Sequence, residues 1–169
     1  MTGSPSVVGI DPGANGALAW LSVGGDLDKV DPMPTVKKVV NGRIVSRVSA
    51  VDLATLLRRY SAAIIRLAVV ERVASMPGQG VASMFAFGRS SGVIEGALAM
   101  AGIEVAFVEP AVWKRSMQVT SAKVTSVARA QAIWPEMAGQ LSEDGPAEAA
   151  LIGLYGLRAN RGKVEALSC

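Results

Sequence analysis

The sequence contains no histidine and only one cysteine, Cys169, which is its last residue. The absence of histidine excludes Ser-His-Asp triads, Cys-His dyads and zinc sites with imidazole ligands. A single cysteine forms no internal disulfide and no thiolate zinc cluster, which favours a reducing compartment. Any chemistry must therefore rely on carboxylates, lysines, hydroxyl groups or a metal ion with oxygen ligands.

Long hydrophobic runs are also missing, although half of the residues are hydrophobic. Arg66 interrupts one of the two longest apolar stretches, and Glu95 and Glu104 interrupt the other. A spanning helix needs about 20 consecutive apolar residues, and the opening letters MTGSPS lack the basic and apolar regions of a secretion signal. We therefore expect a cytoplasmic protein without membrane association.

Length and charge set further bounds on the protein. A chain of 169 residues is large enough to bury the core of one domain. We expect a single domain over residues 1–169, with about the last ten residues frayed. The net charge of +3 permits an anionic partner without proving one.

Turn signals divide the chain into segments that alternate in α/β order. Three strands joined by hairpins come first, and the order helix, strand, helix, strand, helix, helix follows them. This order predicts a mixed sheet of three antiparallel and two parallel strands, with helices on both faces. The expected strands are Val7–Asp11, Ala17–Val23, one within Leu27–Met33 or Arg43–Val48, Ile64–Glu71 and Ile103–Pro110. Four helices are expected. The first runs from a cap at Ser49 or Asp52 to about Tyr60, and the second covers about Val81–Met100. The third runs from a cap at Ser121 to Pro135, and the fourth has Pro146 in its first turn.

Acidic residues follow two of the expected strands and open the last helix. Asp11 and Glu71 each come directly after an apolar run, and Asp144 and Glu148 stand four apart, on one helix face. Each has an ordinary explanation alone: a turn residue before Pro-Gly, an edge charge, or a partner of the helix dipole. If the elements converge, however, the acids repel one another unless a cation lies between them.

The kind of cation follows from the ligands. Oxygen ligands without imidazole or thiolate select Mg²⁺, with Mn²⁺ as a substitute. Two such ions about 4 Å apart activate water and stabilise the leaving oxygen of a phosphodiester. The acids therefore predict metal-dependent phosphodiester hydrolysis.

Four segments that cover about Val7 to Leu157 resemble, in order, the motifs of RuvC-type Holliday junction resolvases, and the likeness is closest to the bacteriophage-encoded branch. They read GIDPGANGALAW, VVERVASMPGQGVASMFAFGRSSGVIEG, WKRSMQVTSAKVTSVARA and DGPAEAALIGLYG. The resemblance implies a ribonuclease-H-like fold, a homodimer and Mg²⁺-dependent nicking of four-way DNA junctions. It also implies that Asp11, Glu71, Asp144 and Glu148 are the metal ligands and catalytic acids.

The sequence departs from the family pattern at three places. The family's final acids are often two aspartates three apart, so Glu143 competes with Asp144 and Glu148. Pro146 stands where phage relatives favour a basic residue. Ala74 stands where bacterial relatives carry an aromatic wedge, and Met76 is the candidate to replace it.

Basic residues are candidates for contacts with DNA. The resemblance implies a role in cleavage for a lysine near Lys123, since a lysine stabilises charge on the scissile phosphate. Lys114, Arg89, Arg115 and Arg129 are candidate contacts to the DNA backbone. Arg89, Arg115 and Arg129 are explained just as well as unpaired surface charges, and the alternative for Lys123 is a solvent-facing lysine at a helix N-terminus.

Glycines recur every four residues on one face of the expected second helix, at Gly88, Gly92 and Gly96. Glycine costs a helix roughly 1 kcal/mol relative to alanine, so the repeat suggests close helix approach. The approach is either a dimer interface or packing against the sheet.

Two rival functions remain open. One is a branched-DNA-binding module of the same fold with degenerate acids; the four acids argue against it, and the departures at Pro146 and Ala74 keep it open. The other is a phosphotransferase of the actin and sugar-kinase type, whose first strand also ends in a GIDxG-like turn. Those proteins duplicate the domain, and 169 residues hold only one copy, so we expect no nucleotide cofactor.

Overall fold

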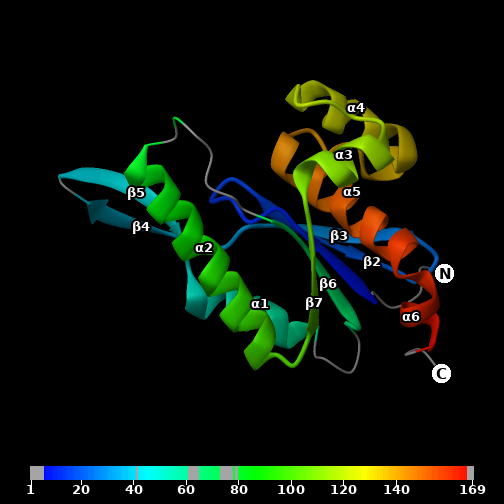
Figure 1. The fold of residues 1–169 in the computed structure, drawn as a ribbon, viewed down its shortest axis with the longest axis horizontal. Helices are drawn as coiled ribbons and strands as arrows, with labels where there is room; N and C mark the ends of the chain where they lie inside the picture. The colour runs from blue at the N-terminus through cyan, green and yellow to red at the C-terminus, as the bar shows by residue number, and fades with distance from the viewer. Residues whose placement is uncertain (1–5, 41, 61–64, 73–77, 79, 167–169) are drawn as a thin grey trace.

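A five-stranded mixed sheet forms the centre of the protein in a computed structural model that describes residues 6–40, 42–60, 65–72, 78 and 80–166 (Figure 1). The strands lie in the order β3-β2-β1-β6-β7. β1 pairs antiparallel with β2 and parallel with β6, β2 pairs antiparallel with β3, and β6 pairs parallel with β7. Their bounds are Val7–Ile10 for β1, Ala17–Leu21 for β2, Leu27–Pro32 for β3, Leu67–Glu71 for β6 and Glu104–Val108 for β7. The predicted mixed sheet is confirmed.

Helices cover both faces of this sheet, as predicted (Figure 1). One face carries α1 (Ala50–Arg59) and α2 (Val81–Met100); the other carries α3 (Pro110–Met117), α4 (Lys123–Ile133), the 3-10 turn η1 (Pro135–Met137), α5 (Asp144–Ala159) and α6 (Arg161–Ala166). Side chains of each strand alternate between the two layers. In β1, Val7 packs in the core beneath α5, whereas Val8 and Ile10 pack in the core beneath α1 and α2.

A separate hairpin follows β3, formed by β4 (Thr35–Val40) and β5 (Arg43–Val48). Both segments that competed for the third strand are therefore strands, and only the earlier one joins the central sheet. The physical reason is burial. Val48 is the one buried residue of β5, so this strand has too little buried apolar surface to form part of the core. Asn41, expected in the hairpin turn, lies outside the described residues, while Gly42 has a φ of +72°.

The helices depart from prediction in three places. Ser49 caps α1 as expected, because its side chain accepts a hydrogen bond from the amide of Asp52. The predicted Ser121 cap is wrong, since α4 begins at Lys123 after Ala122 without a side-chain cap. The eight residues of α3 were not predicted as a helix, and α6 occupies most of the segment expected to fray and buries its Val164.

Close contact between α5 and β1 fixes the position of α5 on the sheet. A Cβ added at Gly9 would overlap the carbonyl oxygen of Ala149 and lie 2.6 Å from the Cα of Gly153. A Cβ added at Gly153 would in turn lie 3.1 Å from the amide nitrogen of Gly9. Only residues without side chains allow this approach, and it holds the start of α5 beside the end of β1.

The glycines of α2 lie in different surroundings. A Cβ added at Gly88, Gly92 or Gly96 would have nothing within 4 Å. The alternative that this face packs against the sheet is therefore wrong, and the dimer interface stays a prediction. Among the described residues, no helix is both long and apolar enough to cross a bilayer.

Candidate functional site

Asp11 and Glu71 lie next to each other at the ends of two neighbouring parallel strands. Ile10 of β1 pairs in register with Val70 of β6, so Asp11 and Glu71, the residues that follow them, lie at the same level of the sheet. Ile10 and Val70 face α1 and α2. Because side chains alternate along a strand, Asp11 and Glu71 point to the opposite face, which α5 covers.

α5 brings Asp144 and Glu148 to the same edge of the sheet. Its first turn packs directly on the loop after Asp11: a Cβ at Gly145 would overlap the carbonyl oxygen of Asn15 and lie 3.1 Å from the Cα of Gly16. Asp144 is the first residue of the helix, and Glu148 lies about one turn later on the same face. Residues far apart in sequence therefore converge on one place.

The electrostatics of Asp11 show this convergence. The pKa of its carboxyl is raised from 3.8 to about 7, mainly by burial, and the charges of Glu71, Glu148 and Asp144 contribute to this increase. The amide of Gly13 opposes these effects by donating to Asp11 Oδ1 at 3.3 Å. The four predicted acids thus lie near enough to act on one another.

Each of the other three acids has its own partner. Burial raises the pKa of Glu71, and the indole Nε1 of Trp113 opposes this by donating to Glu71 Oε2 at 2.6 Å. Lys114 Nζ donates to Glu148 Oε1 at 2.9 Å, and the buried Ser126 hydroxyl donates to the same oxygen at 3.1 Å.

At the mouth of the site, Lys123 pairs with Asp144 and lowers the pKa of that carboxyl. The Lys123 side chain is 76% exposed, whereas Lys114, in its pair with Glu148, is 21% exposed. Lys123 can therefore leave Asp144 with little disturbance of the core.

The donor set fits a hard divalent cation, although the acids are not gathered tightly enough to hold one as they stand. Among the described residues, no group of three or more Asp, Glu or Cys side chains is arranged to hold a metal. Trp113, Lys114 and Lys123 contact carboxylate oxygens of three of the acids. All donors are carboxylate oxygens, and a cation among them would offset the repulsion that helps to keep the pKa of Asp11 near 7.

The other predicted residues are placed less centrally. Arg89 is exposed on α2, and Arg115 is exposed in the last turn of α3. The guanidinium Nε of Arg129 donates to the carbonyl of Met117 at 3.1 Å, so it links α4 to α3. Glu143 is the exposed residue that precedes α5.

Of the departures from the family pattern, Pro146 is the half-buried third residue of α5. Ala74, which stands in place of the aromatic wedge, and Met76, the candidate to replace it, lie outside the described residues. Sequence reasoning missed Trp113 and Ser126 as partners of the acids. Ser126 shares a buried helix face with Ala130, four residues on, which was the available signal; the contact of Trp113 with Glu71 had none.

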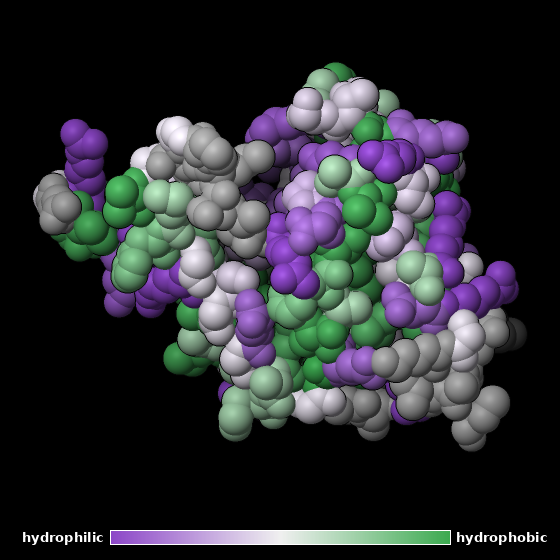
Figure 2. Space-filling model, viewed as in Figure 1, coloured by the Kyte–Doolittle hydropathy of each residue, from purple (hydrophilic) through white to green (hydrophobic). Residues whose placement is uncertain are grey.

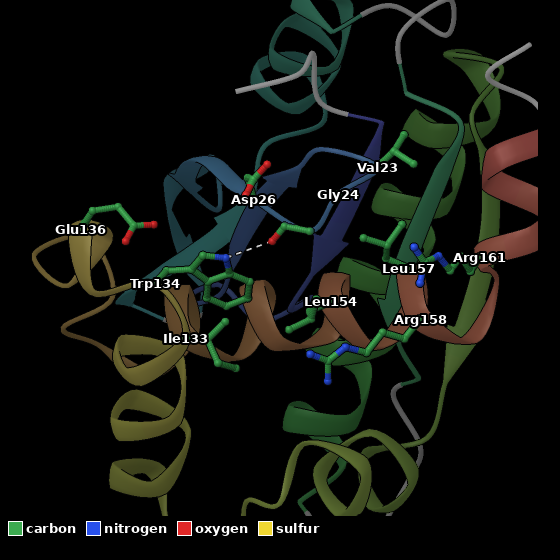
Figure 3. Close-up of a pocket in the computed structure, with 11 residues that line it drawn as sticks. Val23, Gly24, Asp26, Ile133, Trp134, Glu136, Leu154, Leu157, Arg158 and Arg161 are labelled. Carbon is green, nitrogen blue, oxygen red and sulfur yellow. Dashed lines mark hydrogen bonds between the residues drawn. The ribbon is translucent and has the colours of Figure 1, made fainter. Parts of the chain in front are cut away.

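A cavity of about 370 Å³ at the other end of α5 is not part of this site (Figure 3). Leu154, Leu157 and Arg158 line it, more than one turn of the helix beyond Glu148. The indole Nε1 of Trp134 donates across it to the carbonyl of Gly25 at 3.0 Å (Figure 3). This bond ties η1 to the turn between β2 and β3, which is a structural role.

The Asp11→Asn variant should be more stable than the wild type at pH 8 without metal, and equally stable at pH 3. The folded-state pKa of Asp11 is raised to about 7, so folding favours its protonated form. The wild type has the full stabilisation from this protonated acid below pH 3.8 and loses it as the pH rises through 7. Asparagine resembles the protonated acid at every pH. Because one pKa unit corresponds to about 1.36 kcal/mol, the increase from 3.8 to about 7 predicts a gain on the order of 4 kcal/mol at pH 8. Urea unfolding in EDTA measures it, and equal stabilities at pH 8 would contradict the assigned environment.

Comparison with known proteins supports the fold. The chain matches no protein-family model, and no curated protein matches its sequence. The Thermus thermophilus RuvC in complex with a Holliday junction substrate matches with a TM-score of 0.58 and 20% identity, over 92% of this chain and 95% of that one. A second structure of Thermus thermophilus RuvC matches with a TM-score of 0.57 and 21% identity, over 92% and 96%. The chain therefore has the ribonuclease-H-like α/β fold seen in these RuvC structures.

Proposed function

We propose that the protein is a Mg²⁺-dependent endonuclease that cuts four-way (Holliday) and other branched DNA by hydrolysing phosphodiester bonds. The observation that carries the proposal is the convergence of Asp11, Glu71, Asp144 and Glu148 at one edge of a ribonuclease-H-like sheet. The fold is shared with a RuvC solved with a junction substrate. Likeness at 20% identity supports the fold alone, so the chemistry rests on the site.

The four acids would hold two divalent ions, which supply an activated water and stabilise the leaving oxygen. Asp11 and Glu71, at the ends of rigid paired strands, fix the position of the site against the sheet. Trp113 orients the Glu71 carboxylate through its hydrogen bond and opposes the increase in pKa that burial causes.

Two lysines have different roles in the proposed reaction. Lys123, largely exposed and paired with Asp144, moves from that acid to an oxygen of the scissile phosphate. Lys114 stays partly buried between Trp113 and Glu148, where its charge limits the repulsion among the acids. Lys123 is thus the catalytic lysine, and Lys114 holds the site together.

A catalytically weak module that binds branched DNA is the second candidate. The observation that favours it is the set of contacts that occupies three of the four acids and leaves no ready metal cluster among the described residues. Under this alternative the ion pairs would persist in the presence of metal, and the protein would bind a junction without cutting it.

One assay distinguishes the two functions. Labelled four-way junction, flap and linear duplex substrates are incubated with the protein, with and without Mg²⁺ or Mn²⁺. The endonuclease proposal expects metal-dependent nicks in the junction and little cutting of the duplex. A shifted junction that stays intact at saturating concentrations of both metals would favour the binding module instead.

We further propose that the protein is a homodimer through the exposed face of α2. Val81, Phe85 and the glycines at 88, 92 and 96 share this face, and Val81 and Phe85 are 79% and 70% exposed. Such a face fits the same helix of a second copy, because glycines permit close approach.

The Gly92→Arg variant should therefore convert a dimer into a monomer, because a long charged side chain would stand between the two helices. Sedimentation velocity of both proteins measures this directly. Arg58→Gln, which changes an exposed residue of α1, is the control and should stay dimeric. A monomeric wild type, or a variant that still sediments as a dimer, would contradict the assignment.

A further inference from the structure

A groove extends from the acids along the side of the β4–β5 hairpin that faces α2. Its inner part is a cavity of about 390 Å³ that Asp11 and Asp144 help to line, and its outer part is a cavity of about 570 Å³ that reaches Val40 and Arg43. The two parts share Ser46, Arg47, Ser83 and Ala86 as lining residues. The groove therefore starts at the candidate catalytic site and ends near the tip of the hairpin.

The hairpin wall of this groove is basic. Residues 35–48 contain Lys37, Lys38, Arg43 and Arg47, and no acidic residue. In the register of the hairpin, Val36 pairs with Arg47, Lys38 with Val45 and Val40 with Arg43. Because side chains alternate, Arg43, Arg47 and Lys38 share one face, and the two arginines of this face line the groove.

Acidic partners for these arginines are missing in the part of the chain that the structure describes. None of the residues that line the outer cavity is acidic, and neither Arg43 nor Arg47 makes a described ion pair. The first turn of α2, which forms the opposite wall, also lacks an acid. Such a wall complements a polyanion rather than another part of this chain.

The dimensions fit a nucleic-acid backbone. Arg43 and Arg47 are four residues apart on a strand, which places their Cα atoms about 13 Å apart. Along its helix axis, one strand of B-DNA advances about 3.4 Å per phosphate, so this length corresponds to about four phosphates of a duplex that lies along the groove. The hydroxyl of Ser83 lies on the opposite wall, where it can donate to a phosphate oxygen.

We propose that this groove holds the DNA strand that leaves the scissile phosphate, and that Arg43 and Arg47 bind its phosphates. The inference rests on the proposed function, and it adds two DNA contacts that the family motifs do not include. It also assigns a role to the hairpin, which stands apart from the central sheet and projects beside the start of α2 (Figures 1 and 2).

A second protein copy is the rival occupant. Val39 and Ile44 pair with each other and are both 73% exposed. Because side chains alternate along a strand, Val39 and Ile44 lie on the hairpin face opposite Arg43 and Arg47. An apolar contact between this face and a second copy would therefore leave the groove open. The two faces of the hairpin thus favour different partners, and the groove face favours DNA.

The test measures the binding of metal-free protein to a junction by fluorescence anisotropy across a range of salt concentrations. EDTA is present throughout and prevents cutting. The double variant Arg43→Gln, Arg47→Gln should bind at least about tenfold more weakly, and its salt slope should fall by about 0.9 for each phosphate that is no longer neutralised. Arg58→Gln removes one exposed charge from α1 and should change the slope little. Equal affinity and slope in the double variant and in the wild type would overturn the proposal.

A cross-link gives a second measurement that does not depend on the arginine variants. Ser83→Cys in a Cys169→Ser background provides a single thiol in the groove for a photoreactive label. The label should attach to junction nucleotides within a few positions of the cut site. Attachment only to a second protein copy, or to DNA ends far from the branch, would overturn the inference.

The two proposals fail separately. A wild-type protein that binds the junction but never cuts it contradicts the endonuclease function, while the binding comparison still decides the groove. A wild-type protein that cuts junctions, together with a double variant of unchanged affinity, contradicts the groove alone.

Discussion

The Asp11→Asn variant should lose Mg²⁺-dependent cleavage of a four-way junction by about 10³-fold or more while it keeps its affinity for the junction. Burial raises the pKa of Asp11, and with the contribution from the charges of the other three acids it reaches about 7. Asparagine keeps the shape and the hydrogen bond from Gly13, but it lacks the charge that holds a cation. Metal ions contribute several kcal/mol to such a step, and each increment of about 1.36 kcal/mol is tenfold in rate.

Binding should survive because Asp11 repels phosphate rather than attracting it. The measurement is single-turnover cleavage of a labelled junction, with binding followed separately in EDTA. Asp28→Asn makes the same chemical change at an exposed position of β3 and should cut normally. Wild-type cleavage by the Asp11→Asn variant would refute the assigned site.

The Gly9→Ala variant should lose on the order of 3 kcal/mol of stability or more, at the upper end of what overpacking costs. The added methyl group would overlap backbone atoms of α5, the carbonyl of Ala149 and the amide of Gly153. Backbone cannot rotate away as a side chain can, so the helix must move off the sheet. That movement would also carry Glu148 away from Asp11, and activity should fall with stability.

Urea unfolding followed by circular dichroism measures the loss. Gly162→Ala in α6 is the matched control, because a Cβ there meets nothing within 4 Å. It should be neutral or stabilising by up to about 1 kcal/mol, the difference in helix propensity. Similar stabilities for Gly9→Ala and Gly162→Ala would contradict the close contact between α5 and β1.

Periodicity explains why much of the fold could be predicted from the sequence. The apolar runs before Asp11 and Glu71 are buried strands, and the order of elements allowed only a few sheet topologies. The spacing of Asp144 and Glu148 placed both on one helix face. These are local signals, and they were sufficient for the sheet and for the four acids.

Features that depend on distant contacts could not be predicted. Trp113 and Glu71 are 42 residues apart in sequence, and Lys114 and Glu148 are 34 apart. No periodicity reports such pairs. The Ser121 cap failed because α4 begins two residues later, after Ala122, whose side chain cannot accept a hydrogen bond. At this place the hydroxyl of Thr125 donates to the carbonyl of Ala122 and accepts from the amide of Thr120.

Calorimetric titration of Mg²⁺ into metal-free protein at pH 7 tests the central claim, that the acids of β1, β6 and α5 form one divalent-cation site. We predict saturable binding by the wild type, with release of protons because the pKa of Asp11 is about 7, and loss of that binding in both Asp11→Asn and Glu148→Gln. Binding of equal strength in the wild type and both variants, or none in the wild type, would contradict the account.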